Sequence, residues 1–186
     1  MITGAEIVAG LTGAFRLMRR DPGGLACFDT SLPGFWKSFW AAALVAPSFL
    51  ILDLLSGGLT TETSFHEIAI KMIGYVIDWT AFPVVMITVA DSLDRWPNYR
   101  RYIVAYNWSA VVQMWVLLPV VIMAVVAPGH GTHLLAQFVT VVMLVYRAYV
   151  AFVALAVNPG TAAGIVLLDI LLAALLQAVT NRLAGV

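Results

Sequence analysis

Five long apolar runs separated by short loops constrain the fold of this chain more than any other feature. A helix rises about 1.5 Å per residue, so about 20 apolar residues cross the hydrocarbon core of a bilayer. Only 11% of the residues are charged, compared with about a quarter in soluble domains. We therefore predict an all-α, polytopic membrane protein with a bundle of five transmembrane helices. The expected spans are about 36–56, 67–90, 102–126, 134–157 and 161–180.

Residues 4–20 precede these runs and have the pattern of an amphipathic helix. Ile7, Leu11, Phe15 and Met18 recur at helical spacing, and arginines crowd the end of the segment. The segment is too short to span a bilayer, and its basic end is typical of a helix that lies in the interface. The alternative is a solvated helix packed on the rest of the protein. We thus divide the chain into a cytoplasmic or interfacial segment, 1–35, and a five-helix transmembrane domain, 36–186.

Basic and aromatic side chains gather at the expected membrane boundaries on the N-terminal side. Such residues are favoured at headgroup level, where amphipathic rings and long cationic side chains reach both apolar and polar surroundings. We expect them to contact lipid headgroups or a partner, with simple anchoring as the alternative. They are Arg16, Arg19, Arg20, Trp36, Lys37, Trp40, Arg95, Trp96, Arg100 and Arg101.

The distribution of lysine and arginine predicts the orientation of the chain. Basic residues flank the spans on the N-terminal side, whereas loops 57–66 and 127–133 contain none. The positive-inside rule then places the N-terminus in the cytoplasm and the C-terminus in the periplasm of a multi-pass bacterial inner (plasma) membrane protein. Arg182 falls on the less basic side and is the one departure from this pattern.

A pair of opposite charges lies inside the last two runs. Arg147 precedes the turn at Asn158 by eleven residues, and Asp169 follows Pro159 by ten. In helices, both side chains would lie roughly 15–17 Å from the turn, near the middle of the bilayer. Asp78 and Gln113 reach a similar depth in the second and third runs. Four of the five helices are therefore expected to contribute to one polar layer.

This midplane layer has two interpretations. Arg147 is its natural hub, because a guanidinium fork can bind two carboxylates. Two acids around one base leave a surplus negative charge, so one of Asp78 and Asp169 is expected to carry a proton. Charged groups at this depth are costly and either pair with one another or line a wet pathway. The layer is thus a structural pin that fixes helix register, or the site of a transport pathway.

A second polar pair flanks the loop between the first two spans. Asp53 and Lys71 would lie at similar depth, so we predict an ion pair that pins this hairpin. A net charge of zero gives no basic surface for nucleic acid. The sequence contains neither a nucleophile–base pair nor a metal-ligand cluster, so we expect no enzymatic activity, no cofactor and no metal.

Two resemblances add to this interpretation. The segment from Arg20-Asp21-Pro22-Gly23-Gly24 through Phe28-Asp29-Thr30-Ser31 to the aromatic run 34–40 resembles the opening of small, uncharacterised bacterial inner-membrane proteins. The five-span layout behind a cytoplasmic N-terminal segment is loosely similar to that of the Yip family. The Yip-like layout implies a trafficking, scaffold or accessory role and supplies no catalytic residue.

Two functions from different classes fit the sequence. The first is a non-enzymatic accessory or scaffold component that binds partners through helix and lipid-facing surfaces. The alternative is a small oligomeric transporter or channel built around Asp78, Gln113, Arg147 and Asp169. The expected partners are the lipid bilayer and either a second copy of the chain or a larger membrane complex.

Overall fold

A computed structural model describes residues 2–60 and 62–184, and no strand occurs among them. The chain forms helices that are long and apolar enough to cross a membrane five times, after an N-terminal helix. The predicted all-α fold is therefore confirmed, and the chain is a multi-pass integral membrane protein. The elements are α1 (Gly4–Met18), η1 (Pro22–Cys27), α2 (Leu32–Ser38), α3 (Trp40–Leu55), α4 (Phe65–Ser92), η2 (Trp96–Asn98), α5 (Tyr99–Val126), α6 (His130–Leu155) and α7 (Pro159–Ala184).

The first spanning segment begins earlier than the sequence pattern predicts, at Leu32 instead of residue 36. Ser31 accepts a hydrogen bond from the backbone N–H of Gly34 at 3.1 Å and so caps α2. Proline is tolerated in the first turn of a helix, where its missing N–H has no intrahelical partner. The Leu32-Pro33-Gly34 sequence therefore starts a helix, and the boundary predicted at residue 35 falls inside α2.

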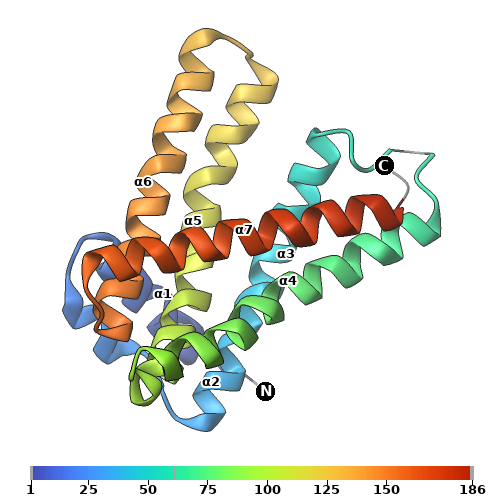
Figure 1. Cartoon of the computed structure of the whole chain (residues 1–186). Coiled ribbons are helices and arrows are strands. Elements are labelled where there is room, and N and C mark those ends of the chain that lie inside the picture. Colours follow the sequence, from blue (N-terminus) through green and yellow to red (C-terminus); the bar gives the residue numbers. More distant parts are fainter. Residues whose placement is uncertain (1, 61, 185–186) are drawn as a thin grey trace.

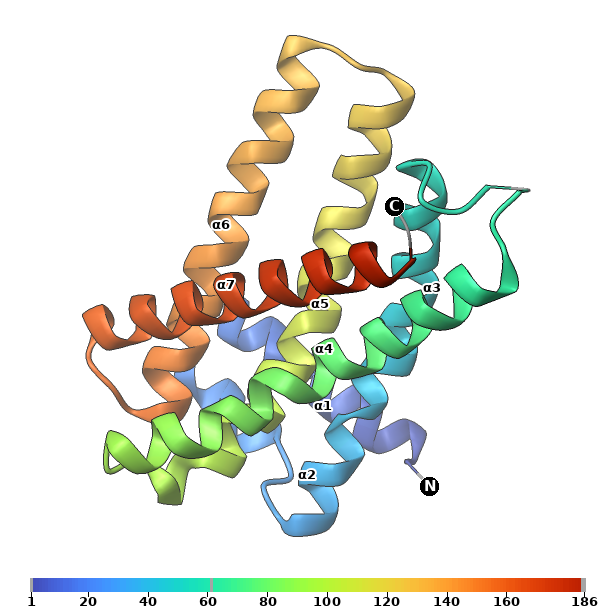
Figure 2. The same ribbon diagram turned by 45° about the vertical axis from the view of Figure 1, so that its right-hand side comes forward.

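The helices are arranged as two antiparallel pairs and a single helix. Figures 1 and 2 show α5 and α6 as a hairpin, with α4 and α7 lying side by side and steeply inclined to it. Helix α3 packs against α5, and α7 also contacts α6. Helices α1 and α2 lie at the end of the bundle that we call the N-terminal side. The α3–α4 and α5–α6 loops lie at the other end, here called the opposite side (Figure 1).

The core is concentrated in the first part of α5, on the N-terminal side. Helices α1, α2, α3 and α6 all pack against α5. Tyr102, Ile103, Val104 and Ala105 are consecutive and all buried, so every face of the helix is covered at this level. Farther along, α5 and α6 leave the α4–α7 pair (Figure 2). The bundle is therefore solid on the N-terminal side and splayed on the opposite side.

Helix α1 packs on the bundle through small residues. Gly10, Gly13, Ala14 and Leu17 are buried, and the Tyr146 hydroxyl donates to the carbonyl of Ala14 at 2.7 Å. Three of the four large apolar residues that predicted the helix are half-buried beside this face, but Phe15 is exposed. Close approach of backbones is thus what docks α1, and its position relative to the lipid stays a prediction.

Helix α6 ends at Leu155 and is followed by Ala156, an alanine with a left-handed backbone conformation (φ 59°). Glycine adopts this conformation without steric cost. We expect Ala156→Gly to raise the free energy of unfolding by about 0.5–1 kcal/mol. Ala148→Gly, inside α6, should lower it by about 1 kcal/mol. Thermal unfolding in detergent measures both, and a loss of stability in Ala156→Gly would contradict this account.

Candidate functional site

Four side chains from three helices form a connected polar network in the middle of the bundle. Arg147 in α6 donates from Nη1 to Oδ2 of Asp169 in α7 at 2.5 Å. Its Nε donates to the amide oxygen of Gln113 in α5 at 3.2 Å. The Tyr106 hydroxyl, also in α5, donates to Oδ1 of Asp169 at 3.0 Å. We call Tyr106, Gln113, Arg147 and Asp169 the central network.

The central network satisfies its own charges. Both carboxylate oxygens of Asp169 accept hydrogen bonds, and its side chain is only 6% exposed. The Arg147 guanidinium also lies 5.8 Å from the centroid of the Tyr106 ring, a cation–π distance. A buried ion pair whose remaining polar atoms are bonded fixes the relative position of the helices that carry it. This geometry agrees with the pin interpretation for three of the four residues predicted in the layer.

Asp78 is separate from this network, which corrects one prediction. The fork of Arg147 binds Asp169 and Gln113, and does not bind the two carboxylates that we expected. Within residues 2–60 and 62–184, Asp78 makes no hydrogen bond or ion pair. Its side chain instead lines a cavity. The residue of the predicted layer without a partner among the described residues is therefore the one that faces open space.

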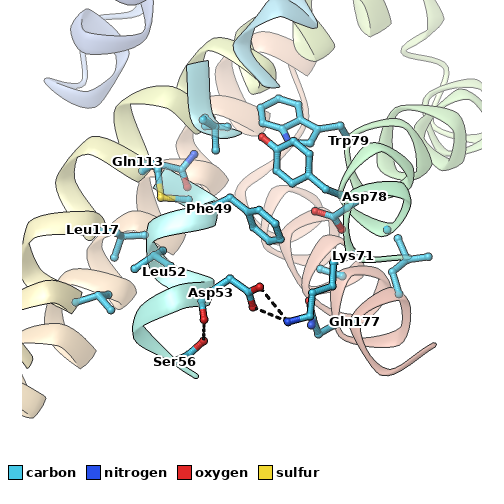
Figure 3. Close-up of a pocket in the computed structure, with 18 of the residues that line it drawn as sticks. Phe49, Leu52, Asp53, Ser56, Lys71, Asp78, Trp79, Gln113, Leu117 and Gln177 are labelled. Carbon is cyan, nitrogen blue, oxygen red and sulfur yellow. Dashed lines mark hydrogen bonds and ion pairs between the residues drawn. The ribbon is translucent and has the colours of Figure 1, made fainter. Parts of the chain in front are cut away.

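This cavity has a volume of about 560 Å³, which lies within the range of small-molecule sites. It extends from the central network to the opposite side of the bundle, between α3, α4, α5 and α7. Figure 3 shows Asp78, Gln113, Asp53 and Lys71 around it, with Phe49, Leu52 and Leu117 between them. Its walls are thus mostly apolar, and its polar groups are grouped at two ends.

The cavity ends on the opposite side at the predicted ion pair of Asp53 and Lys71. The Lys71 ammonium lies 2.9 and 3.1 Å from the two carboxylate oxygens of Asp53. It also donates to the carbonyl of Gly58 in the α3–α4 loop. This pair therefore joins α3, α4 and their loop, and it leaves no free charge at this end of the cavity.

The cavity is closed on the N-terminal side by packed side chains. The Phe82 ring stacks on the ring of Tyr106 with centroids 4.6 Å apart. Phe82, Met86 and Tyr102 are all almost fully buried. These packed side chains therefore separate the cavity from the N-terminal side.

Several residues that we expected at lipid headgroups have partners within the protein. Arg16 pairs with Asp21 at 2.6 Å, and Lys37 pairs with Glu6 at 2.6 Å. The Arg19 guanidinium lies over the Phe15 ring, 4.4 Å from its centroid. These contacts hold α1, η1 and α2 together, and contact with lipid or a partner stays a prediction for them.

The loop before α5 and the first turn of α5 hold the end of α6. Arg95 and Arg101 donate from Nε to the carbonyls of Ala156 and Ala154, at 2.9 and 2.8 Å. Asn98 donates to the carbonyl of Leu155 at 3.1 Å. Side-chain donors thus satisfy three carbonyls at a helix C-terminus, where positive charge is also favourable. Three of the predicted aromatic residues are exposed: Trp36, Trp40 and Trp96. For these residues, and for Arg20 and Arg100, contact with lipid headgroups stays a prediction.

The Glu6–Lys37 pair predicts a pH dependence of stability. The Lys37 ammonium, with help from the backbone N–H and the hydroxyl of Thr3, lowers the pKa of Glu6 from 4.5 to about 2. Because the folded-state pKa is the lower one, the contribution of Glu6 is complete above pH 4.5 and is lost as the pH falls toward 2. The difference in the free energy of unfolding between wild type and Glu6→Gln should therefore become smaller as the pH falls from 4.5 toward 2. In a Lys37→Met background, the same substitution should show a weaker pH dependence. A difference that stays constant throughout would contradict this.

Tyr106, Tyr75 and Trp79 are the site residues that the sequence prediction missed. An aromatic residue in a membrane helix usually packs in the core or anchors at the interface. The useful signal is that Tyr106 and Gln113 are seven residues apart, two helical turns, and so share one face of α5. Trp79 directly follows Asp78 and lines the same cavity (Figure 3).

Comparisons with protein-family models, curated proteins and solved structures find no match to this chain. The Yip-like resemblance therefore stays a prediction. Among the described residues, no three His, Cys, Asp or Glu side chains come together as they would around a metal ion.

Proposed function

We propose that this integral membrane protein is a small transporter that binds its substrate in the cavity between α3, α4, α5 and α7. The observation that carries this proposal is Asp78, which lines a cavity of about 560 Å³ and has no ion-pair partner among the described residues. A structural pin needs no such group, because an isolated charge inside a membrane bundle is costly. A carboxylate that faces open space is thus better explained as a binding group.

The packing around the cavity indicates the side of the membrane from which a substrate would enter. Phe82, Met86 and Tyr102 close it on the N-terminal side, whereas it extends to the α3–α4 loop on the opposite side. We therefore propose that a substrate enters the cavity from the opposite side in this conformation. Transport requires a second state in which the α4–α7 pair moves relative to α5 and α6. The oligomeric state of the transporter stays a prediction.

Accessibility to a water-soluble thiol reagent tests this proposal. In a Cys27→Ser background, single cysteines replace Leu52 and Leu117, which line the cavity. A cysteine at the exposed Val76, outside the cavity, and one at the buried Met86 are the controls. We expect charged methanethiosulfonate reagents to label positions 52 and 117 in native vesicles, from the side of the α3–α4 loop only.

Two results would contradict the proposal. The first is an absence of labelling at positions 52 and 117 from both sides of the membrane, which would favour the accessory or scaffold function. The second is equal labelling at Val76, which would show that the reagent reaches these helices without a cavity.

A further inference from the structure

The geometry points to an organic cation with an apolar body as the ligand of the cavity, with its charge held by Asp78. This inference rests on the proposed function, because it names the substrate class of the same cavity. Three features of the cavity support this inference separately: its charge, its aromatic side chains and its apolar wall.

The charge of the cavity is unbalanced by one carboxylate. Lys71 is paired with Asp53, and Arg147 is paired with Asp169. Asp78 has no such partner among the described residues. A positively charged ligand would supply the missing partner, whereas an anion would meet the carboxylate without a free cation beside it. The cavity therefore favours positive charge at its inner end.

Aromatic side chains lie beside this carboxylate. The rings of Phe49 and Tyr75 have centroids 4.7 Å apart, and those of Tyr75 and Trp79 are 6.3 Å apart. All three residues line the cavity with Asp78, and Figure 3 shows Phe49, Trp79 and the Asp78 carboxylate around the same space. The faces of aromatic rings attract cations, and tryptophan does so most strongly. A carboxylate among aromatic rings suits an organic ammonium or phosphonium ion.

The remaining wall explains why the ligand should be organic. Leu52, Met114 and Leu117 give the cavity an apolar surface that an inorganic ion would leave unused. A divalent cation also needs several oxygen ligands, and no acidic cluster of that kind occurs in the described part of the chain. An apolar body would bury these side chains while its charge remained at Asp78.

Two probe ions of equal shape and opposite charge test this inference. The full-length protein in zwitterionic lipid nanodiscs is titrated in separate samples with radiolabelled tetraphenylphosphonium and with radiolabelled tetraphenylborate, and the unlabelled form of the same ion competes in each. The variants are Asp78→Asn and Trp79→Leu. Their matched controls are Asp91→Asn, at the exposed end of α4, and Trp115→Leu, on the exposed surface of α5.

We expect saturable binding of the phosphonium and no saturable binding of the borate. Loss of a charge-assisted contact should weaken binding at least about tenfold in Asp78→Asn. Loss of a cation–π contact should weaken it about two- to fivefold in Trp79→Leu. Both control variants should bind as the wild type does.

Equally strong saturable binding of the borate, or unchanged phosphonium binding in Asp78→Asn, would overturn the assignment of a cation. So would an absence of saturable phosphonium binding to a protein whose positions 52 and 117 are labelled, and the proposed function would then stand. If those positions are not labelled, the proposed function itself fails. The comparison of Trp79→Leu with Trp115→Leu is a second test, in which the Asp78 carboxylate stays in place.

Discussion

Replacing Arg147 with methionine is expected to destabilise the folded bundle by about 3–5 kcal/mol. The substitution leaves the Asp169 carboxylate, which is 6% exposed, without its ion-pair partner. It also removes the hydrogen bond to Gln113 that joins α5 to α6. Chemical unfolding in mixed micelles, followed by loss of helical signal, measures this change.

Two further variants separate the charge from the packing. Gln113→Leu removes a charge-assisted hydrogen bond from Arg147 but leaves the Arg147–Asp169 ion pair in place, so it should cost less, about 1.5–3 kcal/mol. The double variant Arg147→Met with Asp169→Leu should recover much of the lost stability, because no buried charge is left unpaired. If the double variant were as unstable as Arg147→Met, the unpaired carboxylate would not be the cause.

Gly13→Val is the second substitution with a large expected effect. A Cβ at Gly13 would lie 2.8 Å from the carbonyl oxygen of Gly24 and 2.8 Å from the Phe28 ring. The carbonyl belongs to the backbone of η1 and cannot rotate away. We expect α1 and η1 to separate, with a loss of about 1–3 kcal/mol. Limited proteolysis of the first 30 residues, together with thermal unfolding, measures this separation.

Gly4 provides the matched control for this experiment. A Cβ at Gly4 meets nothing within 4 Å, and the residue lies in the exposed first turn of α1. Gly4→Ala should therefore leave the packing of α1 intact and stabilise the helix slightly. Protection from proteolysis in Gly13→Val equal to that in wild type would show that the glycine contact does not dock α1.

The sequence was sufficient to predict the helices and one of the central contacts. Hydrophobic length determines a spanning helix, because the apolar thickness of a bilayer is nearly constant. Arg147 and Asp169 are placed symmetrically around a short turn, so antiparallel helices bring them to the same depth. The same argument applies to Asp53 and Lys71 on either side of their loop.

The sequence could not predict that Asp78 is separate from Arg147. Counting residues along a helix gives the depth of a side chain, but not the neighbouring helix that it faces. That direction depends on the order of the helices around the bundle. Helix α4 pairs with α7, the spanning helix that is farthest from it along the chain. Asp78 at the same level as Asp169 can thus face the cavity while Asp169 faces Arg147.

The role of the arginines beside α5 could not be predicted for a similar reason. A basic, aromatic loop has the same composition whether it contacts lipid or caps a helix. Arg95 and Arg101 reach the end of α6 only because α5 and α6 are antiparallel neighbours. Composition therefore identified the level of these residues and missed their partners.

We propose that the polar layer divides into a closed network and an open binding group. Unfolding of Asp78→Asn and Asp169→Asn under identical conditions tests it most directly. Asp169→Asn should lose about 3 kcal/mol or more, because Arg147 then lacks its counter-charge. Asp78→Asn should match or exceed the stability of wild type, because an unpaired carboxylate stabilises nothing. Equal losses in the two variants would contradict the division.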